Sequence, residues 1–195
     1  MSAALSTELR VYHAFRSPYS RLGLHILKRA GLNPPIIPFT GPPAGVAFSD
    51  PVANPPKLAY FMQDAARMTA RMGLCLARPD PFEVDFNPAN RALVAAGREG
   101  RGLDFAIAVS DARWGDGKNV SLIEVLAGAA RAIGWSADAA TSAQGDRSIA
   151  EEMSAHRRLI EADGVFGVPF AVAGAEKFWG HDRFGLLVET ISEPA

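Results

Sequence analysis

Two serines stand three positions apart where a strand pattern gives way to a helix pattern. Ser17 and Ser20 lie in the segment FRSPYSRL, residues 15–22, and a proline directly follows Ser17. Serine followed by proline is typical of a helix N-cap and first turn, and the positive end of a helix stabilises a thiolate. The spacing is that of a Cys-x-x-Cys redox motif, yet two hydroxyls form no disulfide. The segment therefore suits a thiolate that another molecule supplies, unless Ser17 is only a helix cap.

Two segments near the C-terminus carry further candidate groups. In GVFGVPF, residues 164–170, a proline opens a strand, and Pro169 is a candidate for a cis peptide bond. The alternative is an ordinary proline of an edge strand. In FWGHDR, residues 178–183, Asp182 is placed to cap a helix or to pair its carboxylate with the ammonium group of a ligand.

The elements that must position these groups run in the order strand, helix, strand, several helices, strand, strand, helix. Short runs of strand-forming residues predict the strands, and apolar residues at helical spacing predict the helices. The expected strands are 8–15, 34–39, 168–173 and 176–179, and the expected helices are 18–30, 57–72, 88–96, 103–114, 121–133, 146–162 and 182–191. Proline at both ends of the second strand indicates a sheet edge or a shortened strand.

Sheet elements at both ends of the chain, with helices between them, imply an α/β fold. The layout matches a thioredoxin-like domain with a large, all-helical insertion. The expected boundaries are 1–45 and 146–195 for the thioredoxin-like domain and 46–145 for the inserted helical domain. Residues 41–56 are rich in proline, glycine and small side chains, so we expect a connection there.

Composition limits the partners and the location. The chain has 195 residues, of which 48% are hydrophobic and 21% charged, with a net charge of -1; this is ordinary for a soluble globular protein. No block of like charges suggests a nucleic acid, and no apolar run approaches the roughly 20 residues of a membrane span. Residues 1–7 lack the features of a signal peptide. We therefore expect a cytoplasmic protein without nucleic-acid or membrane partners.

The other reactive or bulky residues have structural interpretations. Cys75 is the only cysteine and lies between two leucines, so we expect a buried small hydrophobic residue and no intrachain disulfide. No two histidines have metal-ligand spacing with a suitable partner, so no metal is expected. Trp114, Trp135 and the methionines within 62–72 are expected in the core.

Together these segments resemble those of a known family. The chain is similar to the 2-hydroxychromene-2-carboxylate isomerases and the related kappa-class glutathione transferases, within the wider DsbA-like group. The similarity spans nearly the whole chain in the same order and spacing. It rests on SPYS at 17–20, NPPK at 54–57 followed by Tyr60, Asp64 and Arg67, residues 164–169, and residues 178–183.

The resemblance implies a glutathione-dependent cis–trans isomerase that acts on an unsaturated aromatic acid by reversible addition of a thiolate. It implies glutathione as the cofactor and a homodimer as the assembly. Ser17 would hydrogen-bond the glutathione sulfur, and Val168, next to Pro169, would bind the cysteinyl backbone. The γ-glutamyl end would be held by Trp179, Gly180, His181 and Asp182.

The substrate side departs from the family pattern. The resemblance places Tyr19, Asn54 and Pro55 on this side. Family members often carry an apolar residue where Arg16 stands, and a lysine that often contacts the acidic substrate has no counterpart in the shorter loop before Asn54. Arg16 or Lys57 is expected to supply the replacement charge.

Two other functions stay open at this point. A kappa-like glutathione transferase or peroxidase would use the same glutathione site. A redox-inactive, DsbA-like module would instead bind extended peptides or a protein partner, with Ser17 serving only as a cap.

Overall fold

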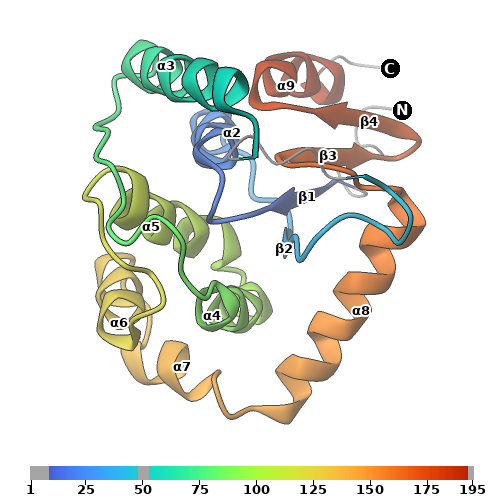
Figure 1. Cartoon of the computed structure of the whole chain (residues 1–195). Coiled ribbons are helices and arrows are strands. Elements are labelled where there is room, and N and C mark those ends of the chain that lie inside the picture. The colour runs from blue at the N-terminus through green and yellow to red at the C-terminus, as the bar shows by residue number, and fades with distance from the viewer. Residues whose placement is uncertain (1–8, 48–52, 193–195) are drawn as a thin grey trace.

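The computed structural model describes residues 9–47 and 53–192 (Figure 1). The expectations for residues 1–7, for Glu8 as the start of the first strand, and for residues 48–52 of the connection lie outside the described residues.

Four strands form one sheet in the order β2-β1-β3-β4. β1 (Arg10–His13) runs parallel to β2 (Ile36–Pro38) and antiparallel to β3 (Phe170–Ala173), which pairs in turn with the antiparallel β4 (Glu176–Trp179). The four predicted strands are confirmed, although the first three are shorter than expected. β2 lies at an edge of the sheet, as its prolines predict.

The helices lie at the predicted places, with one addition. They are α2 (Pro18–Arg29), α3 (Pro55–Arg71), α4 (Asn87–Arg98), α5 (Gly102–Trp114), α6 (Ile123–Ala132), α7 (Ala137–Ser142), α8 (Arg147–Asp163), the 3-10 turn η2 (His181–Arg183) and α9 (Phe184–Ser192). The sequence did not predict α7, because six residues are too few to show a helical period. The α/β, thioredoxin-like architecture with many helices between its sheet elements is thus confirmed.

The two faces of the sheet are covered by different helices. Side chains alternate between faces along a strand, and Val11 and Ala171 belong to a buried cluster that includes residues of α2, α4, α5, α6 and α9. Tyr12 and Phe170 point to the other face, where they pack with Ile160 of α8. Figure 1 shows α8 on one side of the sheet and α2 and α9 on the other. The first cluster is continuous from the sheet into the middle helices, and the division at residues 46–145 stays a prediction.

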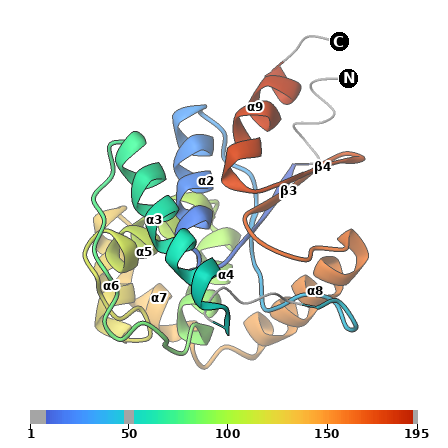
Figure 2. The same cartoon turned by 45° about the horizontal axis from the view of Figure 1, so that its top comes forward.

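Helix α3 is less buried than expected. Tyr60 and Met62 are 61% and 40% exposed, whereas Ala65 and Thr69 are the buried residues of this helix. The expectation of a methionine core was wrong for Met62, while Met68 and Met72 are half-buried. The reason is that α3 packs chiefly on α2, beside which it lies in Figure 2. Cys75 is also exposed, since it follows α3 in an irregular loop.

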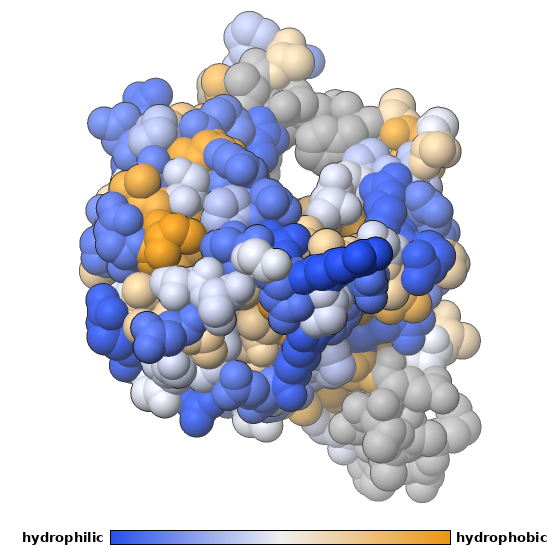
Figure 3. Space-filling model, turned by 90° about the horizontal axis from the view of Figure 1, so that it is seen from below, coloured by the Kyte–Doolittle hydropathy of each residue, from blue (hydrophilic) through white to orange (hydrophobic). Residues whose placement is uncertain are grey.

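Both tryptophans expected in the core are buried, Trp114 at 3% and Trp135 at 5% exposure. Viewed from below (Figure 3), the molecule is largely hydrophilic, and hydrophobic residues gather on the side where α6 lies. Of the helices in the described ranges 9–47 and 53–192, none has the length and apolar character needed to cross a membrane.

Candidate functional site

The strand pairing brings three separate segments to one edge of the sheet. This is the edge at which strands begin and end, not the side at which β2 lies. β1 ends, β3 begins and β4 ends at this edge, because β1 and β4 both run antiparallel to β3. Ser17 follows β1, Val168 precedes β3 and Gly180 follows β4. A hydrogen bond of 2.9 Å from the Gly180 N–H to the Pro169 carbonyl oxygen joins two of these segments. The three predicted groups of site residues therefore converge.

Ser17 caps α2 in a way that leaves its hydroxyl proton available. Its backbone is extended, and its Oγ accepts the N–H of Ser20 at 3.1 Å. A serine hydroxyl both accepts and donates, so this cap uses none of its donor capacity. Ser17 is half-buried, while Ser20 is fully buried with its Oγ 3.5 Å from the N–H of Ala14. Capping and donation to a ligand are thus compatible functions of one hydroxyl, and of the two serines Ser17 is the more accessible.

The Val168–Pro169 peptide bond is cis, which confirms that prediction. Pro169 is buried and Val168 half-buried. The strand ladder begins at Phe170, so no strand pair uses the backbone groups of Val168. The N–H and C=O of Val168 therefore lie at this edge like the backbone groups of an unpaired strand, which can hydrogen-bond an extended ligand.

A glycine sets the close approach of α2 to this proline. A Cβ added at Gly23 would lie 2.9 Å from Cε2 of Phe184 and 3.3 Å from Cβ of Pro169. Phe184 is fully buried and cannot move aside freely.

We therefore expect Gly23→Ala to destabilise the fold by about 1–2 kcal/mol, because overpacking outweighs the helix propensity gained with alanine. Gly185→Ala is the matched control, since a Cβ there meets nothing within 4 Å. Urea denaturation of both variants tests this. Equal stability of Gly23→Ala and Gly185→Ala would contradict it.

An aromatic contact ties the segment after β4 to α2 and α3. The ring of His181 stacks on that of Tyr19, with centroids 4.9 Å apart and an interplanar angle of 11°. The Tyr19 hydroxyl donates to Asp64 of α3 at 2.8 Å. Burial lowers the pKa of His181 although the carboxylates of Asp182 and Asp64 act to raise it. Nε2 of His181 is buried and has no hydrogen-bond partner within the described part of the chain.

Of the remaining predicted glutathione residues, Trp179 and Asp182 are exposed and Gly180 is half-buried. Trp179 is 55% exposed and packs edge-to-face against Phe166, with ring centroids 4.8 Å apart. It also lies close to Gly167, where an added Cβ would be 2.9 Å from Nε1 of Trp179. Asp182 forms an ion pair of 2.9 Å with the adjacent Arg183, and both side chains are more than half exposed. Gly180 has φ +96°, a conformation that favours glycine.

The predicted substrate residues divide into two groups. Arg16 and Tyr19 flank the Ser17-Pro18 dipeptide at the start of α2. Asn54, Pro55 and Lys57 instead form the exposed start of α3, where the Asn54 side chain accepts the N–H of Lys57 at 3.1 Å.

α3 contacts Tyr19 of α2 further along, at Phe61 and Asp64. The rise of 1.5 Å per residue puts Asn54 about 15 Å along the helix from Asp64. Asn54 and Pro55 thus lie at the N-terminal end of α3, about two to three turns before its contacts with Tyr19.

Sequence reasoning missed Glu83 as a partner of Arg16. Nη2 of Arg16 lies 2.7 Å from Oε1 of Glu83, in the loop between α3 and α4. No sequence signal marks this pair, since Glu83 lies in a segment without periodicity. The close approach at Gly23 was missed as well, although a glycine inside a helix is a signal for it.

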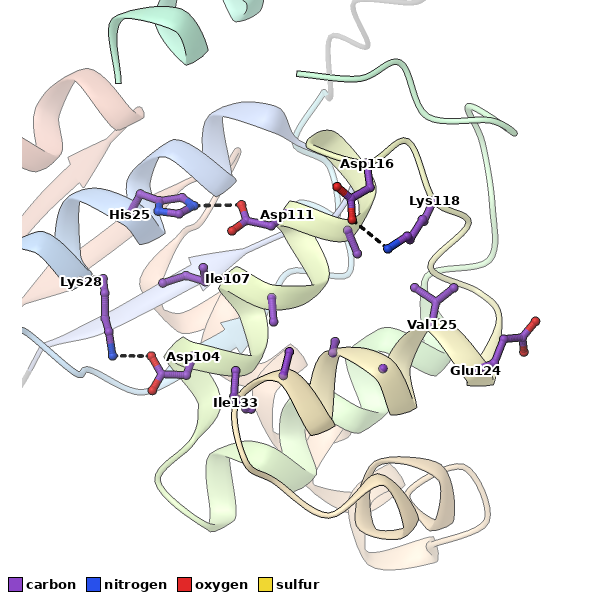
Figure 4. Close-up of a pocket in the computed structure, with 15 residues that line it drawn as sticks. His25, Lys28, Asp104, Ile107, Asp111, Asp116, Lys118, Glu124, Val125 and Ile133 are labelled. Carbon is purple, nitrogen blue, oxygen red and sulfur yellow. Dashed lines mark hydrogen bonds and ion pairs between the residues drawn. The ribbon is translucent and has the colours of Figure 1, made fainter. Parts of the chain in front are cut away.

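A groove of about 650 Å³ lies elsewhere, between α2, α5 and α6 (Figure 4). Nε2 of His25 is 2.9 Å from Oδ1 of Asp111, and Asp104 pairs with Lys28 at 2.5 Å. Figure 4 shows these pairs along the groove, whose floor is largely of apolar or small residues. None of the predicted site residues lines it. Within residues 9–47 and 53–192, no three His, Cys, Asp or Glu side chains are grouped so that they could hold a metal ion.

Comparison with known proteins agrees with the fold. The model of the DsbA-like thioredoxin domain matches residues 8–192. The 2-hydroxychromene-2-carboxylate isomerase of Sphingobium xenophagum is 31% identical over 133 residues, which are 68% of this chain and 67% of that protein. The protein of the same name from Pseudomonas putida is 26% identical over 133 residues, 67% of this chain, and the match spans 64% of that relative's length.

A solved 2-hydroxychromene-2-carboxylate isomerase has the same fold, with a TM-score of 0.78 at 23% identity over 94% of this chain and 93% of that one. The family model covers nearly the entire sequence, and the Sphingobium relative exceeds 30% identity over two thirds of it. The chain therefore belongs to the DsbA-like thioredoxin family, with 2-hydroxychromene-2-carboxylate isomerases among its relatives.

Proposed function

We propose that this chain is a glutathione-dependent cis–trans isomerase that acts on an unsaturated aromatic acid. One arrangement carries the proposal. The half-buried Ser17 hydroxyl, with its proton uncommitted, stands at the N-terminus of α2 on the sheet edge that also holds Val168 and the segment after β4. The names of the two isomerase relatives supply the reaction type.

The residues at this edge fit glutathione in three respects. The backbone of Val168 lies outside the strand ladder, so its N–H and C=O can pair with the cysteinyl backbone of the ligand. The exposed carboxylate of Asp182 suits the ammonium group of the γ-glutamyl end. The helix end and the Ser17 hydroxyl favour an ionised thiol.

When bound, glutathione supplies a thiolate that adds reversibly to a conjugated double bond and so permits rotation about it. Ser17 donates a hydrogen bond to the sulfur, while the Ser20 N–H holds the Ser17 oxygen in place. Burial first, and then the hydrogen bond to Asp64, raise the pKa of Tyr19, which keeps its phenol protonated. Tyr19 therefore acts by packing and hydrogen bonding rather than as a base.

Calorimetry with reduced glutathione tests the cofactor, and conversion of a cis or trans aromatic acid with and without glutathione tests the reaction. We expect binding at millimolar glutathione or below, and turnover only when it is present. The concentration of free thiol should stay constant during turnover, whereas a transferase would consume it in proportion to product. Absence of both binding and turnover would refute the proposal.

One observation favours a peptide-binding module as the second candidate. The exposed aromatic pair Phe166–Trp179 lies beside the unpaired backbone of Val168, which is a suitable surface for an extended peptide. A rise in melting temperature with glutathione would count against this candidate. A homodimer is part of our proposal, and light scattering on the purified chain measures it.

A further inference from the structure

A carboxylate of the chain itself binds the arginine next to Ser17. Nε of Arg16 donates to both carboxylate oxygens of Glu83, at 2.9 Å and 3.1 Å, and its Nη2 lies 2.7 Å from Oε1. This forked geometry is the one by which arginine recognises carboxylates of ligands. The Arg16 and Glu83 side chains are 32% and 53% exposed, so water and small solutes can reach the pair.

Glu83 belongs to an irregular loop that we call the strap, residues 73–86 between α3 and α4. In Figure 1 it is the green trace from α3 past α5 to α4. The Ala77 N–H donates to the Trp114 carbonyl oxygen at 2.7 Å, and Nη1 of Arg21 donates to the Cys75 carbonyl oxygen at 2.7 Å. The strap is therefore fastened to the end of α5 and to α2 on the side of Ser17.

A buried arginine lies beneath the part of the strap that carries Glu83. Arg113 of α5 is fully buried, and its Nη2 donates to the carbonyl oxygen of Phe82. Its guanidinium carbon stands 4.8 Å from the centre of the Phe86 ring. Nε and Nη1 of Arg113 have no hydrogen-bond partner in the described residues. The hydrogen bond to Phe82 attaches this part of the strap to α5, and the positive charge of Arg113 attracts the carboxylate of Glu83.

Burial lowers the pKa of Arg113 to about 10, with Glu83 opposing and Arg16 assisting this change. The charges of Glu83 and Arg16 therefore both affect the pKa of Arg113, and the three side chains interact electrostatically. At neutral pH Arg113 stays charged.

We propose that Glu83 occupies on Arg16 the place of a substrate carboxylate, so that the strap is an internal competitor which an aromatic acid must displace to bind beside Ser17. The identification of this place as the substrate side rests on the proposed function. The strap thereby sets specificity: an acid can exchange with Glu83 on Arg16, whereas a neutral analogue gains nothing from that exchange. Phe82, edge-to-face with Trp114 at 6.2 Å, keeps the adjacent segment anchored when Glu83 departs.

Calorimetry at low salt with trans-cinnamate and its neutral amide, both without glutathione, tests the competition. Glu83→Gln is expected to strengthen cinnamate binding about threefold to fivefold, the range typical of a partly exposed ion pair, and to leave the amide unchanged. Arg16→Gln should reduce the affinity for cinnamate to that for the amide.

Glu151→Gln is the matched control, because it removes the same charge from an exposed ion pair on α8. The Glu151 side chain is 70% exposed and that of its partner Arg147 is 92% exposed. It should change neither affinity. The proposal is overturned if Glu83→Gln strengthens both ligands equally or strengthens neither, including the case in which neither ligand binds. Glutathione binding is measured separately, so failure of the competition between Glu83 and an acid is distinguishable from failure of the proposed function.

Discussion

Replacing Ser17 by alanine is expected to slow turnover about 10- to 100-fold while changing the affinity for glutathione less. A hydrogen bond to a charged group is worth roughly 1.5–3 kcal/mol, and about 1.4 kcal/mol corresponds to a factor of ten in rate. An unperturbed thiol has a pKa near ~8.5, so only a few per cent is ionised at neutral pH without help. In the proposed complex, Val168 and Asp182 still bind the rest of the ligand in the variant, so affinity should fall less than the rate.

The decisive measurement is a spectrophotometric titration of the thiol bound to both proteins. If Ser17 donates to the sulfur, the pKa of the bound thiol rises in Ser17→Ala. Equal pKa values in the two proteins would remove Ser17 from the catalytic mechanism, whatever the change in stability.

Loss of the cap must be separated from loss of the donor. Ser136→Ala is the matched control, because Ser136 caps α7 with the same geometry and its Oγ accepts the Ala139 N–H at 3.2 Å. Each substitution should cost about 1 kcal/mol of stability through its cap. Only Ser17→Ala should alter the thiol pKa and the rate at saturating substrate, measured well below the melting temperature.

Much of the fold follows from patterns that are local in the chain. A few adjacent residues are enough to predict the edge strand β2, which has prolines at its ends. The same holds for the end of α8 at Gly164, whose φ of +65° is left-handed. The exposure of Tyr60 and Met62 was not predictable in this way. A helical period shows which face of α3 is apolar, but the presence of a neighbour that covers the face depends on tertiary packing.

The candidate site likewise contains residues that local sequence patterns predict and residues whose contacts depend on tertiary packing. Ser17, Pro169 and Asp182 each stand at an element boundary, and the antiparallel pairing of β3 with β1 and β4 brings these boundaries to one edge of the sheet. Glu83 was not predictable, because its contact with Arg16 joins positions 67 residues apart through an irregular loop. Arg113 lies in a helix pattern, yet nothing in that pattern indicates that its charge is buried.

Replacing Asp163 by asparagine is expected to destabilise the fold by about 3 kcal/mol at neutral pH. Its carboxylate accepts two hydrogen bonds from Arg10, at 2.7 Å and 2.6 Å, and a third from the Tyr12 hydroxyl. These contacts join the end of α8 to β1. The Asp163 side chain is 11% exposed, and removing one partner of such a pair leaves the other charge without compensation. Asparagine keeps the shape but turns an N–H₂ group toward at least one of these three donor groups.

The loss should depend on pH with a defined sign. Desolvation acts to raise the pKa of Asp163, but the hydrogen bonds from Arg10 and Tyr12 outweigh it and hold the pKa below its usual range. A carboxyl group with a lowered pKa stabilises the fold above its unfolded pKa, near ~4, and this contribution disappears as the pH falls through the folded value.

The difference in unfolding free energy between the wild type and Asp163→Asn should therefore be greatest near pH 7 and should shrink in acid. Urea denaturation at several pH values measures it. Asp116→Asn is the control, since Asp116 pairs with Lys118 and both side chains are 56% exposed; it should cost less than about 0.5 kcal/mol at any pH. A difference for Asp163→Asn that stays constant from pH 7 into acid would mean that packing, and not the carboxylate charge, holds α8 against β1.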